Sequence, residues 1–245
     1  MVVHCQAWCA LSWFRLGRWQ DFAEGIAVLE QMLGDRRTDP PYFALGPFGA
    51  AAFVCELRGE RGTADRFLAV VERSIRENRA GETMAVALAS LVRSRRGEFD
   101  AAWRLSDLLL PKPRGHIPIV WETRCDLVAD TGSWHRATET LGSAREAAER
   151  GQLVALPAFA DRLEGRAALA GNDAESAIMP LTEARNRFKE IGARWERAYT
   201  ELSLGEALIR AGKEKQGRLE LHRALTVFDQ LHSVREAERA KQLLG

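Results

Sequence analysis

The chain has 245 residues, and its 35 Lys and Arg residues nearly balance its 34 Asp and Glu residues, giving a formal net charge of +1. This balance provides no general field to attract phosphates, so a nucleic-acid binder would need a strongly segregated basic patch. Hydrophobic residues make up 46% and charged residues 28%, which is typical of a folded chain and excludes a disordered one.

The sequence predicts a cytoplasmic protein with no membrane contact. The longest nearly apolar run, from Ala44 to Cys55, is shorter than the roughly 20 residues that a membrane-spanning helix needs. No basic segment or cleavage pattern follows Met1, so we expect no secretion signal. The cysteines have neither disulfide-framework nor zinc-ligand spacing, which suits a reducing compartment. They are Cys5, Cys9, Cys55 and Cys125.

Six short turns share one pattern along the chain. Each has the apolar end of a helix, a glycine, two or three polar or aromatic residues, and a small residue that opens a second helix. The glycines recur every 35 to 42 residues, which is the length of a helical hairpin repeat. The position after a helix favours a positive φ, which glycine adopts without strain. These glycines are Gly17, Gly59, Gly97, Gly132, Gly171 and Gly212.

The segments around these turns are predicted to be helical. They are rich in Ala, Leu, Arg and Glu, and their apolar residues recur at intervals of three and four. Strand signals are nearly absent, so we expect an all-α chain forming one domain over 1–245. Ser233 and Glu236 fit a capping box at the start of a last helix. In chain order, the expected hairpins cover approximately 3–34, 42–78, 82–110, 116–150, 153–191 and 195–231, and a capping helix covers 233–244.

Small residues recur at fixed distances from the turn glycines. Seven positions before the glycine, five of the six hairpins have a small residue or a cysteine, and Glu164 is the exception. Five positions after it, five of six again have a small residue, and Phe22 is the exception. Small side chains allow two antiparallel helices to approach closely. The small residues are Ala10, Ala52, Ser90, Cys125 and Gly205 in the first set and Ala64, Ala102, Ala137, Ser176 and Gly217 in the second.

These features resemble the tetratricopeptide repeat over most of the chain. The last third, from Leu181 to Leu244, is similar to the C-terminal repeat region of large bacterial signalling ATPases, both LuxR-type (maltose-regulator-like) transcriptional regulators and cyclase-linked relatives. The resemblance implies a right-handed α-solenoid of about six hairpins with a cap. In those families the array follows a nucleotide-binding module and often precedes a DNA-binding helix-turn-helix. The sequence has no G-x-x-x-x-G-K-[ST] loop, so we expect an array separated from such a regulator.

The resemblance also implies where a partner would bind. In such arrays the first helix of each hairpin lines a concave groove, at positions ten, six and three before the turn glycine. The implied groove is apolar in its N-terminal half and acidic in its C-terminal half, which suits an apolar helix or a basic peptide. Alternatively, these positions are solvated or packed against neighbouring hairpins. The predicted binding residues are Leu11, Phe14, Phe53, Glu56, Leu91, Glu122, Asp126, Asp161 and Glu206.

The first helix predicts a second contact surface. The segment from Val2 to Phe14 is rich in large apolar residues, whereas the end of a repeat array needs a polar outer face. A preceding helix would cover it, or it would form a dimer face through Trp8, Leu11 and Trp13.

No pattern in the sequence indicates catalysis, a metal or a cofactor. There is no nucleophile motif, and the carboxylates show only ordinary helical spacing. Cys5 and Cys9 share a helix face with His4, but no second pair completes a zinc site, so we interpret them as core or surface thiols. The other histidines are scattered and are expected at the surface. They are His116, His135, His222 and His232.

The leading hypothesis is a non-catalytic scaffold or signal-relay module of a bacterial regulatory protein that binds a protein partner. The alternative is a repeat domain that senses a small-molecule inducer in a channel flanked by Trp121 and Trp134. RNA-binding helical repeats are more basic and more regular in length, so they are less favoured. Arginine far outnumbers lysine, which reflects either the base composition of the genome or a groove whose guanidinium groups bind carboxylates.

Overall fold

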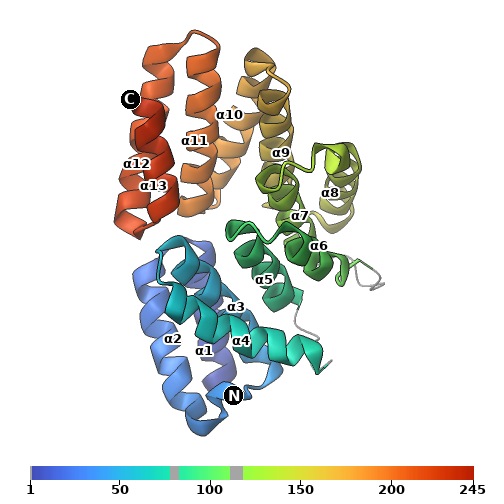
Figure 1. Ribbon diagram of the computed structural model, residues 1–245, viewed down its shortest axis with the longest axis vertical. Helices are drawn as coiled ribbons and strands as arrows, with labels where there is room; N and C mark the ends of the chain where they lie inside the picture. Colours follow the sequence, from blue (N-terminus) through green and yellow to red (C-terminus); the bar gives the residue numbers. More distant parts are fainter. Residues whose placement is uncertain (1, 78–82, 111–117) are drawn as a thin grey trace. The chain divides into compact units, whose positions relative to one another are not determined.

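The computed structural model describes residues 2–77, 83–110 and 118–245, and Figure 1 labels its helices. The described residues form thirteen α-helices and two short 3-10 helices, with no strand among them. The predicted all-α class is therefore confirmed. Internal packing divides the chain into two compact units, Met1–Thr123 and Arg124–Gly245, and each is treated by itself below. The predicted hairpin ends at 78, 82 and 116, together with His116, lie outside the described residues.

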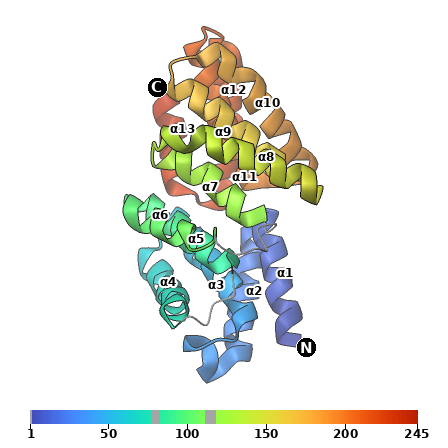
Figure 2. The same ribbon diagram turned by 90° about the vertical axis from the view of Figure 1, so that its right-hand side faces the viewer.

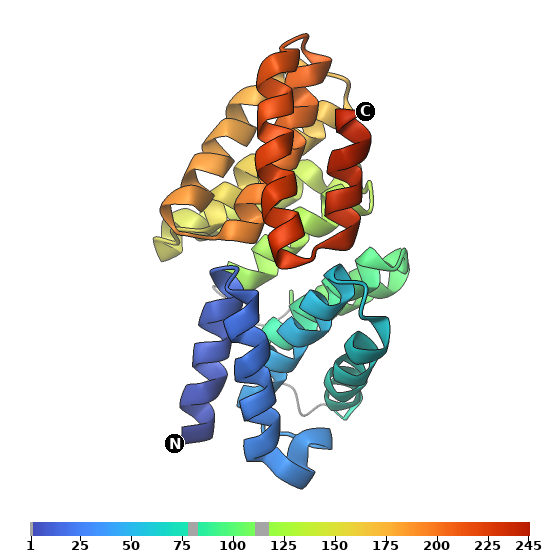
Figure 3. The same ribbon diagram turned by 90° about the vertical axis from the view of Figure 1, so that its left-hand side faces the viewer.

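In the first unit, helices pack against their neighbours in the sequence. The helix α1 lies beside α2, as Figure 3 shows, and also contacts α3, while α3 packs against α4 and α5. The helix α5 packs in turn against α6. The elements are α1 (Val2–Arg15), α2 (Trp19–Leu33), η1 (Gly34–Thr38), α3 (Tyr42–Leu57), α4 (Arg61–Arg76), α5 (Thr83–Arg95), α6 (Phe99–Asp107) and the start of α7 (Pro118–Asp130).

The core of the first unit is mainly apolar and includes most of α3. Most residues of α3 are buried, including the large side chains of Leu45, Phe48 and Phe53. Gly49 allows α5 to approach closely, because a Cβ on Gly49 would lie 3.0 Å from the Cα of Ala85. Each buried side chain of the size of leucine or phenylalanine contributes about 1.5–3 kcal/mol relative to exposure.

The second unit is built from longer helices in the same sequential manner. Figure 2 shows α8, α9 and α10 next to one another, and α11 packs against both α10 and α12. The last helix, α13, packs against α12. The elements after α7 are η2 (Trp134–Arg136), α8 (Ala137–Gly151), α9 (Leu156–Ala170), α10 (Ala174–Glu190), α11 (Arg194–Arg210), α12 (Glu214–Leu231) and α13 (Val234–Leu244).

Glycines set the closest helix crossings in the second unit. A Cβ on Gly165 would lie 2.5 Å from the Cγ of Leu181, so α10 could not approach α9 as closely if this residue had a side chain. At the next crossing, a Cβ on Gly205 would lie 2.7 Å from the Cγ of Leu221 and 3.0 Å from the carbonyl oxygen of Gly217. The expected close approach at Gly205 and Gly217 is thus present.

One turn departs from the predicted glycine pattern. Five of the six turn glycines have a positive φ, but Gly171 has a φ of −78° and Asn172 takes the left-handed position with a φ of 63°. The prediction for Gly171 is therefore wrong. Asparagine tolerates this conformation better than most residues. The hairpin is shifted by one residue, so its small residues are Gly165 and the buried Ala177 rather than the exposed Glu164 and Ser176.

None of the helices in the described part of the chain has the length and apolar character that crossing a bilayer requires.

Candidate functional site

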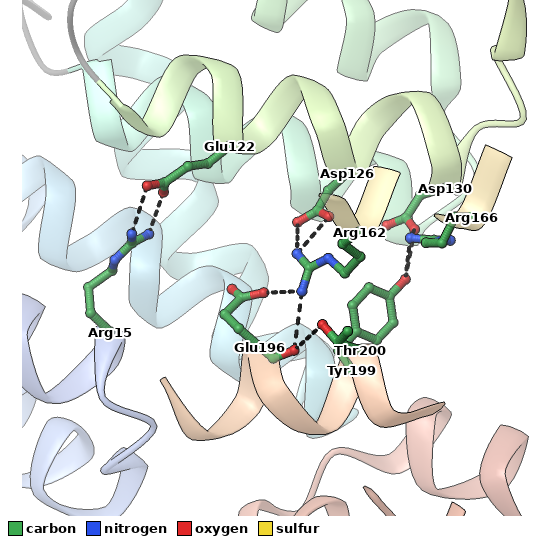
Figure 4. A network of polar contacts seen from close by, with 9 residues as sticks. All are labelled: Arg15, Glu122, Asp126, Asp130, Arg162, Arg166, Glu196, Tyr199 and Thr200. Carbon is green, nitrogen blue, oxygen red and sulfur yellow. Dashed lines mark hydrogen bonds and ion pairs between the residues drawn. The ribbon is translucent and has the colours of Figure 1, made fainter. Parts of the chain in front are cut away.

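Polar side chains on α7, α9 and α11 of the second unit are buried or half-buried in contact with one another, and we call this set the polar ladder (Figure 4). Each helix contributes two residues separated by three or four positions, which places both on one helix face. These residues are Asp126 and Asp130 on α7, Arg162 and Arg166 on α9, and Glu196 and Tyr199 on α11.

Arg162 is the centre of the polar ladder. Its Nη2 donates to both carboxylate oxygens of Asp126, at 2.8 and 2.9 Å, and its Nη1 donates to Glu196 Oε2 at 2.6 Å. The same Nη1 also donates to the Glu196 carbonyl at 3.3 Å. Only 1% of the Arg162 side chain is exposed, so its charge is balanced by two carboxylates from the helices on either side of α9.

Aromatic rings complete the surroundings of Arg162. The guanidinium carbon lies 4.8, 5.0 and 5.2 Å from the ring centroids of Phe159, Phe188 and Tyr199. The faces of aromatic rings attract a cation, and more strongly where water is excluded. The rings therefore add stabilisation to a guanidinium whose Nε has no hydrogen-bond partner.

A second set of contacts, around Arg166, lies one helical turn further along the same helices. Arg166 pairs with Asp130 at 2.9 Å and its Nη1 donates to the Tyr199 hydroxyl at 3.1 Å. The hydroxyl of Tyr199 donates to Asp130 Oδ1 at 2.7 Å. Tyr199 thus contacts both arginines, because its ring faces Arg162 and its hydroxyl joins Arg166 to Asp130.

A branch leads from the polar ladder to the last helix. The Trp195 ring stacks on Tyr199 with a centroid distance of 4.9 Å, and its Nε1 donates to Ser233 Oγ at 3.3 Å. Ser233 Oγ in turn donates to Glu236 Oε2 at 2.7 Å. The predicted capping box is wrong in its bonding, because the Ser233 side chain makes no cap hydrogen bond to the helix backbone and binds the Glu236 side chain instead.

Burial controls the protonation of the polar ladder. Loss of hydration raises the pKa of Asp126 to about 6, although the Arg162 guanidinium opposes this rise. Burial alone would lower the pKa of Arg162, but the carboxylates of Asp126 and Glu196 raise it further above its usual range. Folding therefore favours the protonated form of Asp126 between its ordinary pKa of 3.8 and about 6, and its contribution to stability falls as the pH rises through that window.

In the first unit, the predicted groove residue Glu122 forms a separate buried ion pair. Arg15 Nη1 donates to Glu122 Oε2 at 2.6 Å and Nη2 donates to Oε1 at 2.9 Å, which is the bidentate geometry in which arginine binds carboxylate best. Only 2% of the Glu122 side chain is exposed. Its carboxylate is already satisfied within the unit.

The apolar residues predicted to line the groove are mostly buried. Leu11, Phe53 and Leu91 are all buried, and only Phe14 is half-buried. The ring of Phe14 packs edge-on against Phe53 with the centroids 6.4 Å apart. Glu56, from the same predicted set, accepts from Arg96 Nη2 at 2.7 Å. These side chains contact their own unit.

Two predicted acidic residues remain partly accessible in the second unit. Asp161 on α9 lies 3.2 Å from Arg187 Nε and 4.0 Å from Arg145 Nη2. Glu206 on α11 accepts from Arg239 Nη2 at 2.8 Å and lies 3.5 Å from Arg210 Nη1. Asp126, by contrast, is buried in the polar ladder. The structure brings Asp126 together with Arg162, but it surrounds Asp161 and Glu206 with separate surface arginines.

The predicted dimer face divides into an exposed and a buried part. Trp8 is 61% exposed, whereas Leu11 is 7% exposed. Trp13 is half-buried, and a Cβ on Gly25 of α2 would lie 2.7 Å from its ring. Leu11 and Trp13 therefore hold α1 to its own unit, and Trp8 points outward.

The central residues of the polar ladder were not among the predicted site residues. Arg162, Arg166, Glu196 and Tyr199 carry most of its contacts, and counting back from the turn glycine did not select any of them. Their signal in the sequence is the four-residue spacing of Arg162 and Arg166, which matches that of Asp126 and Asp130 one repeat earlier.

The remaining thiol and imidazole groups form no cluster. Within the described ranges, no group of three or more His, Cys, Asp or Glu side chains is arranged to hold a metal ion. Cys5 and Cys9 are exposed and Cys125 is buried, while burial raises the pKa of Cys55 to about 12. His135, His222 and His232 are exposed. Trp121 belongs to the first unit and Trp134 to the second, and both are half-buried.

Comparison with known proteins gives no assignment: no family model matches the chain, and no curated protein is significantly similar to it.

Proposed function

We propose that the chain is a non-catalytic interaction module, a right-handed solenoid of tetratricopeptide-like hairpins that binds a segment of a protein partner within a bacterial regulatory system of the cytoplasm. Helices that pack in sequence, left-handed residues in the turns and glycines at the crossings all support a repeat architecture.

The observation that carries the proposal is the spacing of polar contacts in the second unit. Arg162 binds carboxylates 36 residues before it and 34 residues after it. Arg185 binds Glu220 35 residues later, and Arg194 binds Gln230 36 residues later. Contacts one repeat apart arise when equivalent positions of successive hairpins face each other, as they do in a helical-repeat array.

The polar ladder supports a binding role by making the inner helices rigid. Arg162 is paired with Asp126 and Glu196. A ligand that took either carboxylate away would leave a buried charge without its partner, which costs about 3–5 kcal/mol. A rigid surface loses less entropy when it binds a partner. We therefore assign the polar ladder to the support of the binding face, and the binding itself to accessible residues.

Asp161 on α9 and Glu206 on α11 are the acidic residues best placed to receive a partner. Their side chains are 19% and 21% exposed, and the arginines that hold them, Arg187 and Arg239, are 46% and 59% exposed. Exposed ion pairs of this kind contribute only about 0–1 kcal/mol, so a basic side chain of a partner can replace the resident arginine. The favoured ligand is a basic amphipathic helix or an extended basic peptide.

A phage-displayed peptide library, selected on the full chain, tests this proposal. Selected basic peptides should bind the Asp161→Ala/Glu206→Ala variant at least 10-fold more weakly by calorimetry, and the salt dependence of binding should fall. The matched control is Glu190→Ala/Glu238→Ala, which removes two exposed acids elsewhere in the same unit. Equal binding to both variants, or selection of acidic peptides, would refute the proposed surface. Thermal stabilisation by small metabolites, with no peptide selected, would instead support the inducer-sensing alternative.

For assembly, we propose a homodimer through the exposed face of α1. The observation that favours it is Trp8, a large aromatic side chain that is 61% exposed on a helix whose Leu11 is buried. An exposed tryptophan of this kind can anchor a protein–protein interface.

A further inference from the structure

Two buried carboxylates lie outside the polar ladder, on helices that pack closely. Glu201 on α11 is 4% exposed and Glu220 on α12 is 6% exposed. The two helices are closest where Gly205 meets Gly217, since a Cβ on Gly217 would lie 2.7 Å from the Gly205 carbonyl oxygen. Glu201 is one turn before Gly205 and Glu220 is three residues after Gly217, so both carboxylates belong to the tightest part of the hairpin.

Each carboxylate has one oxygen with a partner and one without. Glu220 Oε1 accepts from Arg185 Nη1 at 2.9 Å and from Arg223 Nη1 at 2.8 Å. Glu201 Oε1 lies 3.3 Å from Arg197 Nε. The second oxygen of each group, Oε2, is buried and has no hydrogen-bond partner. A buried acceptor without a donor costs about 1–3 kcal/mol.

A proton shared between the two Oε2 atoms would give each of them a hydrogen-bond partner. On a protonated Glu201, Oε2 becomes a donor, and Glu220 Oε2 is an acceptor that needs one. Glu220 accepts hydrogen bonds from two arginines, whereas Glu201 has one arginine at a longer distance. Burial raises the pKa of Glu201 to about 7, and the Glu220 carboxylate adds to this rise while the arginines oppose it.

Other charged groups around α11 are engaged elsewhere. On α9, Arg162 and Arg166 bind Glu196 and Tyr199 of α11. From α13, Arg239 binds Glu206. The groups that face Glu201 are therefore Arg197 of its own helix, Arg185 of α10, and Glu220 and Arg223 of α12.

We propose that Glu201 carries a proton in the folded protein and donates it to Oε2 of Glu220, and that this carboxyl–carboxylate hydrogen bond clamps α12 to α11 until the pH rises above neutrality. The clamp makes the second unit a pH-responsive element that does not depend on any partner.

The direction of the response follows from proton binding. An acid whose folded pKa exceeds its ordinary value takes up a proton on folding, so stability is greatest below the ordinary value of 4.5 and falls until the pH passes about 7. This shift corresponds to an unfolding equilibrium constant that is about 300-fold larger above the window than below it.

Urea denaturation of the full chain at pH 5, 6, 7 and 8 tests the clamp. The unfolding equilibrium constant of the wild type should rise from pH 5 to pH 8. Glu201→Gln can donate to Glu220 at every pH, so its unfolding constant should rise at least 10-fold less over the same range. The control is Glu206→Gln on the same helix, which should keep the wild-type pH dependence. A Glu201→Gln variant with the full wild-type pH dependence would overturn the proposal.

A second measurement titrates Glu201 in the wild-type protein and does not depend on the Glu201→Gln variant. In the wild-type protein with 13C-labelled glutamate carboxyl groups, one carboxyl resonance should titrate near pH 7, and Glu220→Gln should move that midpoint to lower pH because the neighbouring negative charge is removed. If every glutamate carboxyl titrates below pH 5.5, Glu201 is ionised at neutral pH and the clamp does not exist.

Discussion

The two units of this protein build helical hairpins with different cores. In the first unit, the central helix α3 is almost wholly apolar and packs through Leu45, Phe48 and Phe53. In the second unit, α9 buries Arg162, whose guanidinium donates to Glu196 and faces the ring of Tyr199 on α11. Shortening an apolar side chain lowers the free energy of unfolding in proportion to the volume removed. Removing one partner of a buried ion pair lowers it more, because the other charge stays buried without a partner. The second unit should therefore be the more sensitive to single substitutions of its polar residues.

The largest expected effect comes from removing the central charge. Arg162→Met keeps most of the side-chain volume but leaves Asp126 and Glu196 without their arginine, so we expect a loss of about 3–5 kcal/mol. In the first unit, Phe53→Leu should cost only about 1 kcal/mol because it is a modest change of shape in an apolar site. Urea denaturation followed by circular dichroism measures both.

A rescue variant separates charge from packing. Arg162→Met combined with Asp126→Asn and Glu196→Gln should recover at least half of the lost stability, because no ionised group then remains buried without a partner. If Arg162→Met alone costs no more than Phe53→Leu, the contrast between the units is wrong.

The next effect contrasts the two faces of α1. Leu11→Glu buries a carboxylate in the first unit and should cost about 2–4 kcal/mol, whereas Trp8→Glu changes an exposed residue and should cost less than about 0.5 kcal/mol. Light scattering after size-exclusion chromatography should show wild type as a dimer and Trp8→Glu as a monomer. A wild-type monomer at high concentration would refute the proposed dimer.

Alanine substitutions at the glycines of the helix crossings should differ between the units, because the neighbouring atoms must move by different amounts. A Cβ on Gly49 would lie 3.0 Å from the Cα of Ala85, whereas a Cβ on Gly165 would lie 2.5 Å from the Cγ of the buried Leu181 and 3.1 Å from the carbonyl oxygen of Ala177, so Gly165→Ala requires the larger shift. We expect losses of about 1–2 kcal/mol at Gly49 and about 2–3 kcal/mol at Gly165. Gly142→Ala on α8, with nothing within 4 Å, should instead stabilise by about 0.5–1 kcal/mol. Thermal denaturation ranks the three variants, and a destabilised Gly142→Ala would contradict this explanation.

The smallest effect lies in the turns. Gly212→Ala should cost about 1 kcal/mol because its φ is 78°, whereas Gly171→Ala should change stability by less than about 0.5 kcal/mol because its φ is −78°. Equal losses at the two positions would show that Gly171, and not Asn172, takes the left-handed conformation in solution.

The helical class and the helix crossings could be predicted from the sequence because they depend on local chemistry. Repeated glycines, small residues at fixed offsets and apolar periodicity indicate helices that approach closely, and Gly205 and Gly217 meet as expected. The shift at Asn172 was missed because asparagine replaces glycine in the left-handed position, and the count began one residue early.

The candidate site was harder to predict because it depends on partners far apart in the sequence. The position rule selected Asp126 and Glu122 as groove residues, but nothing in the sequence shows that Arg162 and Arg15 bind their carboxylates. An acidic residue on an inner face can be open to a ligand or paired with an arginine one repeat away. Only the structure distinguishes the two cases, because it shows which side chain of a neighbouring helix lies beside the carboxylate.

Arg162 also constrains the order in which the second unit can form during synthesis. Its partners Asp126 and Glu196 lie on α7 and α11, on either side of α9 in the chain. When α7 and α9 have left the ribosome but α11 has not, the guanidinium has only one of its two carboxylates and its stacked tyrosine is absent. The hairpin of α9 and α10 should therefore be more stable after α11 has been synthesised than before.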